Sequence, residues 1–144
     1  MRETGRIIGL DIGDVRIGVA VSDPLGITAQ GREVLRVSSP EKDVDAIKNI
    51  VNETGAVRIV AGLPLDQNGE IGSQAEKVLN FVETLRNALD IDIVTQDERF
   101  STAAAERALI GANMRRNKRK NVIDMVAAQH ILQTYLDRQS NSGA

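Results

Sequence analysis

Three acidic residues occupy positions where a packed apolar residue, or the end of a strand or helix, would otherwise be expected: Asp11, Glu98 and Asp124. Asp11 and Glu98 each follow an apolar run, and Asp124 lies near the start of an apolar helical stretch. A buried carboxylate is costly unless it is paired or bound to a cation. Oxygen donors gathered without His or Cys favour Mg2+ or Mn2+, and two such ions can activate water against a phosphodiester. These residue types predict a metal-dependent nuclease.

Each acid also has a structural interpretation. Asp11 can be a turn acid that hydrogen-bonds to the local backbone. Glu98 can be a surface charge paired with Arg99, and the adjacent Asp97 competes with it as a ligand. Asp124 lies in the first turn of a predicted helix, where the helix dipole favours an acid without any catalytic role. The coincidence of three acids favours the site.

A predicted β-hairpin positions the first acid. Apolar runs at 7–10 and 17–22 flank a polar turn at 13–15, which is the sequence signal of a hairpin. Asp11 then falls at the end of the first strand. Glycines 9, 13 and 18 leave backbone room around it for a ligand to approach.

The rest of the chain predicts helices and strands in alternation. Further strands are expected at 30–37, 57–62 and 92–97, and helices at 41–54, from 73, from 101 to about 109, and at 122–138. A capping box at Ser73–Glu76 begins the second helix, and Asn121 can cap the last one. The order predicts an α/β fold with a mixed sheet and helices on its faces. If the first and last strands are neighbours beneath the last helix, the three acids meet at one end of the sheet.

The composition is that of one globular unit. The chain has 144 residues, of which 42% are hydrophobic, and this is enough to form a core. The charged fraction of 26% is that of a globular protein. We expect a single domain over 1–139 and a flexible tail over 140–144. The net charge of -2 does not indicate a nucleic-acid binder, so any such role must come from local clustering. Without Cys, an export signal or a membrane-spanning run, the expected location is cytoplasmic.

One strongly basic run precedes Asp124, and it comprises Arg115, Arg116, Lys118, Arg119 and Lys120. Such a run is usually a solvated surface loop. Here its closeness to the candidate metal site favours contact with a phosphate backbone.

Other candidates for phosphate contact lie beside the acids. Arg16 and Arg99 are close to them in sequence and can stabilise phosphate charge. Ser101 or Thr102, at the start of a predicted helix, can hold a phosphate oxygen.

Four motifs occur in order along nearly the whole chain: Gly9–Gly13 with Arg16–Ala20, Gly62–Leu65, Asp97–Thr102, and Asp124 with Ala127 and Ala128 after it. Together they resemble the YqgF/RuvX family of Holliday-junction-resolvase-like nucleases. The resemblance implies a ribonuclease H-like fold, with a five-stranded mixed sheet flanked by helices on both faces, and a divalent-metal site. It also implies a role in maturing the 5′ end of 16S ribosomal RNA, or in resolving junctions.

The resemblance maps the catalytic carboxylates onto Asp11, Glu98 and Asp124, the acids that the residue types had already indicated. The nature of the nucleic acid, ribosomal RNA precursor or branched DNA, stays open at this point. So do the mode of cutting, endonuclease or exonuclease, and the choice between a monomer and a weak homodimer.

Two other classes compete with the nuclease. The Asp-x-Gly turn also resembles the phosphate-binding hairpin of actin-like sugar kinases and chaperone ATPases. Those proteins need a second nucleotide-binding lobe, for which 144 residues leave no room. A non-catalytic nucleic-acid-binding or transcription-associated protein would use the basic run and would not require the acids.

Overall fold

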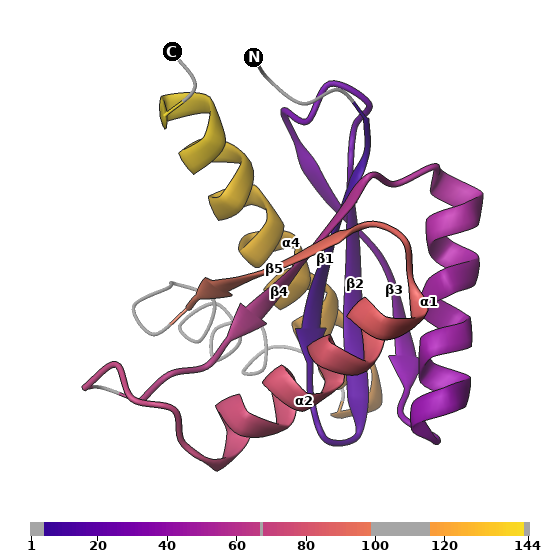
Figure 1. The fold of residues 1–144 in the computed structure, drawn as a ribbon, viewed down its shortest axis with the longest axis vertical. Helices are drawn as coiled ribbons and strands as arrows, with labels where there is room; N and C mark the ends of the chain where they lie inside the picture. The colour runs from indigo at the N-terminus through magenta and orange to yellow at the C-terminus, as the bar shows by residue number, and fades with distance from the viewer. Residues whose placement is uncertain (1–4, 67, 99–115, 143–144) are drawn as a thin grey trace.

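A computed structural model of the chain describes residues 5–66, 68–98 and 116–142 (Figure 1). Its strands are β1 (Ile7–Ile12), β2 (Arg16–Ser22), β3 (Ala29–Arg36), β4 (Arg58–Leu63) and β5 (Asp92–Asp97). Its helices are α1 (Pro40–Thr54), α2 (Ser73–Ala88) and α4 (Arg116–Ser142). The predicted strands and the first two predicted helices are therefore confirmed to within a few residues.

The strands form one mixed sheet in the order β3-β2-β1-β4-β5. The pairs β1–β2 and β2–β3 are antiparallel, whereas β1–β4 and β4–β5 are parallel. The predicted five-stranded mixed sheet is confirmed. The condition considered for bringing the acids together, that the first and last strands are neighbours, is not met, because β4 lies between them. The reason is that β4 is an apolar run buried on both faces, which is typical of a central parallel strand.

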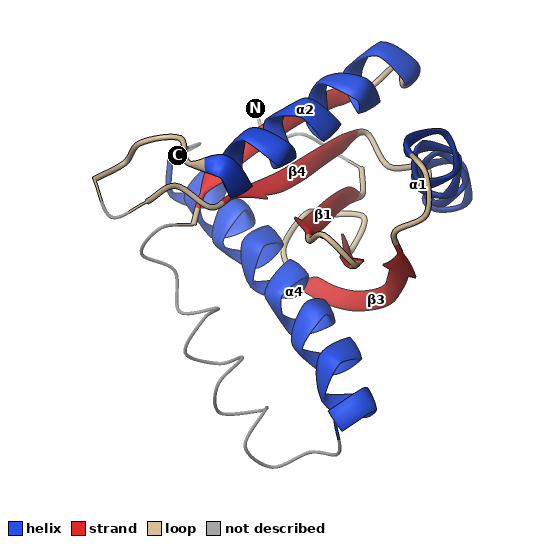
Figure 2. Cartoon of the chain, turned by 90° about the horizontal axis from the view of Figure 1, so that it is seen from below, coloured by secondary structure: helices blue, strands red, loops and turns tan. Residues whose placement is uncertain are grey.

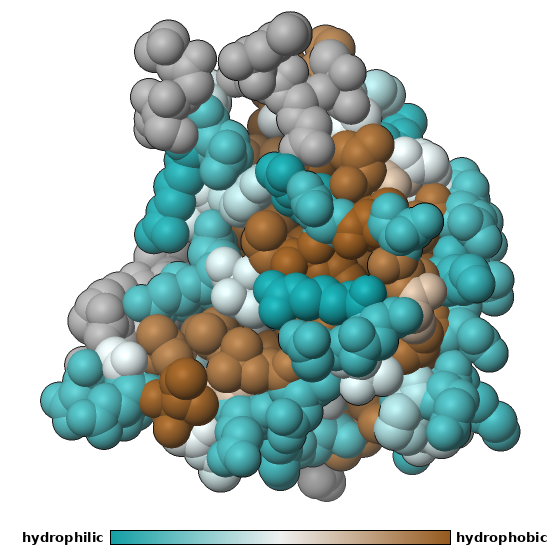
Figure 3. Space-filling model, in the orientation of Figure 1, coloured by the Kyte–Doolittle hydropathy of each residue, from teal (hydrophilic) through white to brown (hydrophobic). Residues whose placement is uncertain are grey.

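Helices cover both faces of the sheet (Figure 2). Helices α1 and α2 pack on one face, and α4 crosses the other. Long aliphatic side chains such as Leu10, Ile47 and Leu85 fill the first core. Figure 3 shows apolar residues between polar ones on the side of the molecule in view.

Helices α1 and α2 begin differently. The Ser39 side chain caps α1 by accepting from the Lys42 N–H, and Gly55, at φ +69°, ends that helix. At α2 the N-cap is Gly72, with no side-chain capping bond, and Ser73 already lies inside the helix. The predicted capping box at Ser73–Glu76 is therefore wrong. Glycine is also tolerated as an N-cap, so the helix can begin one residue earlier.

Helix α4 is longer than predicted at both ends. It begins at Arg116 rather than after Asn121, so residues 116–120 of the basic run are helical and not a loop. Arg and Lys are good helix formers, which explains the extension. The helix also continues past residue 138 to Ser142, into the segment expected to be a tail. No helix in the described ranges is long and apolar enough to cross a membrane.

Candidate active site

Asp11 lies in a row of three residues that crosses the middle of the sheet. In the β1–β2 ladder, Asp11 pairs with Gly18. In the β1–β4 ladder, Leu10 pairs with Ala61, so the next positions along, Asp11 and Gly62, lie side by side. The acid therefore has a glycine on each neighbouring strand.

This row faces α4. A Cβ at Gly9 would lie 2.7 Å from Cβ of Leu132 on that helix. Because side chains alternate along a strand, Asp11 points to the same face as Gly9. Both flanking glycines face it too, since a Cβ at Gly18 would overlap the main chain of Asp124. One at Gly62 would lie 2.9 Å from Oε2 of Glu98.

The two glycines thus place the other two acids on either side of Asp11. Asp124 lies over Gly18, and the Glu98 carboxylate lies over Gly62. A larger residue at either glycine would collide with α4, and at Gly62 also with the Glu98 carboxylate. The Asp124 main chain and the Glu98 carboxylate reach the two sides of Asp11 through the register of β4, and not through direct pairing of β1 with β5. That the three acids form one site stays a prediction.

The end of β5 determines which of two adjacent acids reaches this row. Asp97 pairs with Leu63 and is exposed. Glu98 follows, and its N–H donates to the Leu63 carbonyl over 3.2 Å. Its Oε2 is buried. Alternation along the strand therefore places Glu98, and not Asp97, on the face of α4.

Asp124 is held by the first residue of β2. Nε of Arg16 donates to Oδ2 of Asp124 over 2.8 Å, and the two side chains are 28% and 20% exposed. This contact joins the hairpin to α4. Within the described residues, no group of three or more His, Cys, Asp or Glu side chains is arranged to hold a metal ion as it stands.

The residues nevertheless fit a divalent cation in their chemistry. Three carboxylates supply only hard oxygen donors, which Mg2+ and Mn2+ prefer. The glycines on both sides of Asp11 let α4 and the Glu98 carboxylate approach it, because a Cβ at either position would collide with them. One of the three acids, Asp124, is already engaged by the Arg16 guanidinium.

Only some of the residues predicted to contact phosphate lie in the described part of the chain. Arg116, Lys118, Arg119 and Lys120 belong to the first turns of α4, about two turns before Asp124. Arg99, Ser101, Thr102 and Arg115, together with the helix predicted from 101 to 109, lie outside the described residues.

Two features of the site were missed in the sequence. One is the role of Gly62, whose position at the end of an apolar strand was an available signal. The other is the pairing of Arg16 with Asp124 rather than only with a phosphate. These residues are 108 positions apart, so no local pattern connects them.

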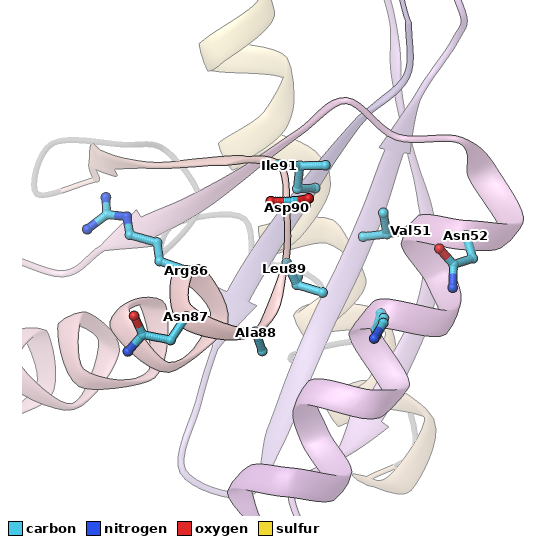
Figure 4. A pocket seen from close by; sticks show the side chains of 9 residues that line it. Val51, Asn52, Arg86, Asn87, Ala88, Leu89, Asp90 and Ile91 are labelled. Carbon is cyan, nitrogen blue, oxygen red and sulfur yellow. The ribbon is translucent and has the colours of Figure 1, made fainter.

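A separate cavity of about 440 Å3 opens on the opposite side of the sheet, between α1 and the end of α2 (Figure 4). Its lining includes Asn52, Arg86 and Asp90. The Arg86 guanidinium points away from Asn52 and donates to the Ile93 carbonyl over 3.2 and 2.9 Å. The cavity holds none of the three acids.

Comparison with known proteins gives a consistent picture. A family model described as RuvX, Holliday junction resolvase, matches residues 5–138. A protein of Desulforamulus reducens named "Putative pre-16S rRNA nuclease" is 54% identical over 92% of this chain and 96% of its own length. A protein of Clostridioides difficile with the same name is 51% identical over 96% of this chain and 98% of its own.

Solved structures share the fold at low sequence identity. RuvC of T. thermophilus in complex with a Holliday junction substrate superposes with a TM-score of 0.57 at 11% identity, covering 96% of this chain and 97% of that one. The fowlpox virus Holliday junction resolvase gives 0.56 at 11% identity, covering 92% and 98%. These neighbours confirm the ribonuclease H-like fold.

Proposed function

Because this chain belongs to the RuvX family of Holliday junction resolvases, which are nucleases, we propose that it is a divalent-metal-dependent nuclease that matures the 5′ end of 16S ribosomal RNA. The relatives that are about half identical over nearly their whole length carry the name of a pre-16S rRNA nuclease. The observation that carries the proposal is the row Gly18–Asp11–Gly62, with Asp124 on one side and Glu98 on the other.

In this proposal the three acids are the metal ligands. Asp11, in the middle of the row, would hold the metal together with Glu98 and Asp124. When bound, Mg2+ or Mn2+ supplies an activated water and neutralises charge on the phosphodiester and the leaving oxygen. The contribution of the protein is to hold the carboxylates on three rigid elements, since precise placement of reacting groups accounts for much of a rate enhancement.

Basic side chains would bind the backbone of the nucleic acid. We assign this role to Arg16, which begins β2 beside the acids, and to Arg116, Lys118, Arg119 and Lys120 at the start of α4. Arg99, Ser101, Thr102 and Arg115 are assigned the same role from the sequence. Contacts of this kind are electrostatic, so binding should weaken steeply as salt rises.

Branched DNA is the second candidate substrate. It is favoured by the description of the family and by the fold shared with RuvC. Symmetric cutting of a four-way junction requires two active sites related by a two-fold axis. A monomer would be sufficient for RNA maturation, so the oligomeric state during cleavage separates the two candidates.

The test compares cleavage of a labelled precursor fragment with cleavage of a four-way DNA junction, in Mn2+ and in EDTA. Asp11→Asn removes the central ligand. Asp14→Asn is the matched control, because it makes the same change three residues away at an exposed position whose side chain pairs with Lys77. We expect Mn2+-dependent cutting of RNA by the wild type and Asp14→Asn, and none by Asp11→Asn.

Other outcomes would support a different function. Cutting of the junction alone makes it a resolvase. If neither substrate is cut in any metal while RNA still binds, the nuclease proposal fails and a binding role based on the basic run replaces it. Equal activity in Asp11→Asn and Asp14→Asn would remove Asp11 from the site.

A further inference from the structure

We propose that Arg16 is a positioning residue whose guanidinium competes with the metal for Asp124. In the metal-free protein Arg16 holds Asp124, and cation binding displaces it. This inference rests on the proposed function, because it takes Asp124 to be a metal ligand. The property at issue is which group neutralises the Asp124 carboxylate before a metal binds.

The position of Arg16 in the sheet supports this competition. Arg16 precedes Gly18 by two residues in β2, so both face α4. Gly18 is the neighbour of Asp11 and lies under the Asp124 main chain. The guanidinium therefore reaches Asp124 from the edge of the same row that the metal would occupy. Arg16 already occupies Oδ2 of Asp124, so a cation bound among the acids would compete with it for that carboxylate.

The strength of the contact allows exchange. An ion pair with side chains 28% and 20% exposed is still solvated, and such pairs contribute little net stability. A divalent ion bound by several carboxylates together can exceed this contribution.

Displacement would also give the released guanidinium a new use. A guanidinium beside a metal-bound phosphodiester has the donor geometry to pair with phosphate oxygens. The same side chain would then serve the metal-free and the loaded enzyme with different partners, and its availability to nucleic acid would depend on the metal.

A direct test follows the Arg16 Nε–H signal by NMR in the full chain as Mg2+ replaces EDTA. We expect the signal to shift as the bond to Asp124 is lost. Arg32 is the internal control, since its Nε donates to Glu33 over 3.1 Å, outside the site. An Arg16 signal that stays unchanged at saturating Mg2+ overturns the inference.

A second test measures Mn2+ affinity without substrate by calorimetry. Arg16→Gln should bind Mn2+ up to about fivefold more tightly than the wild type, the range expected for loss of one competing surface pair. Arg32→Gln is the matched variant: it removes an equal charge from a side chain 30% exposed, whose partners are Glu33 and Glu53. Equal Mn2+ affinity in these two variants overturns the inference.

Further variants separate folding effects and failure of the proposed function. Arg16→Lys keeps a cation beside Asp124, so its Mn2+ affinity should lie between those of the wild type and Arg16→Gln. If Arg16→Gln does not fold, an unchanged affinity in Arg16→Lys together with an unchanged NMR signal contradicts the exchange. Mn2+ binding that is lost in Asp11→Asn but unaffected by Arg16 leaves the proposed function intact. Absence of any Mn2+ binding in the wild type overturns both.

Discussion

The two faces of the sheet present side chains of different size. Toward α1 and α2 the strands present long aliphatic side chains, among them Ile8, Leu10 and Ile59. Toward α4 the middle strands present Gly9, Gly18 and Gly62. Their other buried residues on this face are Ile7, Ala20 and Val60. Large side chains hold the first two helices at a distance. Glycines allow α4 to approach so closely that the Ala128 carbonyl would lie 3.0 Å from a Cβ at Gly9.

The polar contacts differ in the same way. Glutamine side chains bind α4 to the sheet: Gln96 donates to the Ile131 carbonyl over 2.9 Å, and Gln129 donates to the Ala29 carbonyl over 3.1 Å. Gln133 also accepts from the Ala29 N–H over 2.9 Å. Directional bonds of this kind fix a helix in one position, which apolar packing alone does less strictly. The comparison indicates that one face provides stability and the other provides placement of the acids.

The largest loss of stability should follow Ile47→Ala on the aliphatic face. Ile47 is fully buried, so its truncation should cost about 2–5 kcal/mol in the free energy of unfolding, measured with urea. Cleavage per folded molecule should not change. Ile71→Ala is the control, because Ile71 is 59% exposed. A tenfold fall in cleavage by folded Ile47→Ala would contradict the division between the faces.

Gly18→Ser, on the face toward α4, should cost less stability than Ile47→Ala but should impair the site. The new Cβ meets the Asp124 main chain, and the resulting displacement of α4 should cost about 1–3 kcal/mol. Mn2+ affinity should fall as well, because a ligand moves. Gly72→Ser makes the same change with nothing within 4 Å of the added Cβ, at an N-cap where Ser is favoured. If both variants keep wild-type Mn2+ affinity, close approach of α4 is not what places Asp124.

Gln96→Leu tests the directional bonds. It removes the hydrogen bond to Ile131 while keeping a similar volume, and should cost about 1 kcal/mol in urea denaturation. The exposed Gln30→Leu on β3 should lie within about 0.5 kcal/mol of the wild type. Equal stability of the two variants would mean that apolar packing alone holds α4.

The smallest effect is expected at the β2–β3 turn, which α4 contacts through the bond from Gln133 to the Ile27 carbonyl. The backbone N–H groups of Thr28, Ile27 and Leu25 lower the pKa of Asp23 from its ordinary 3.8. A lowered pKa stabilises the fold above the ordinary value, and that contribution is lost as pH falls through the folded value. Asp23→Ala should therefore be less stable than the wild type at pH 7, and the difference should shrink toward pH 2. A difference that stays constant with pH would contradict this account.

Much of the fold follows from local pattern. The hairpin was predictable because β-branched runs flank a Gly-Asp turn, and the turn closes with the Gly13 N–H donating to the Arg16 carbonyl over 3.0 Å. Helix α1 was predictable because Pro40 and Gly55 mark its ends. The start of α4 was misjudged, because Asn121 offered a cap while the helix-forming basic residues before it favoured continuation.

The sequence could name candidate residues for the site but not how they are arranged. Residue type singled out the three acids, since carboxylates beside apolar runs are costly. Their arrangement depends on the register between β1 and β4, which places Gly62 beside Asp11. Strand order and register are tertiary properties, so no local pattern specified them. The same holds for the contact between Arg16 and Asp124 across 108 positions.

This separation along the chain has a consequence for the newly made protein. The strands of the opening hairpin can pair soon after synthesis, whereas contacts between distant residues form late because long loops must close. Until α4 has left the ribosome, Asp11 and its two glycines have no helix above them. The proposed nuclease would therefore become competent in a single late step, and a nascent chain that still lacks α4 could not cut the RNA of the ribosome that is making it.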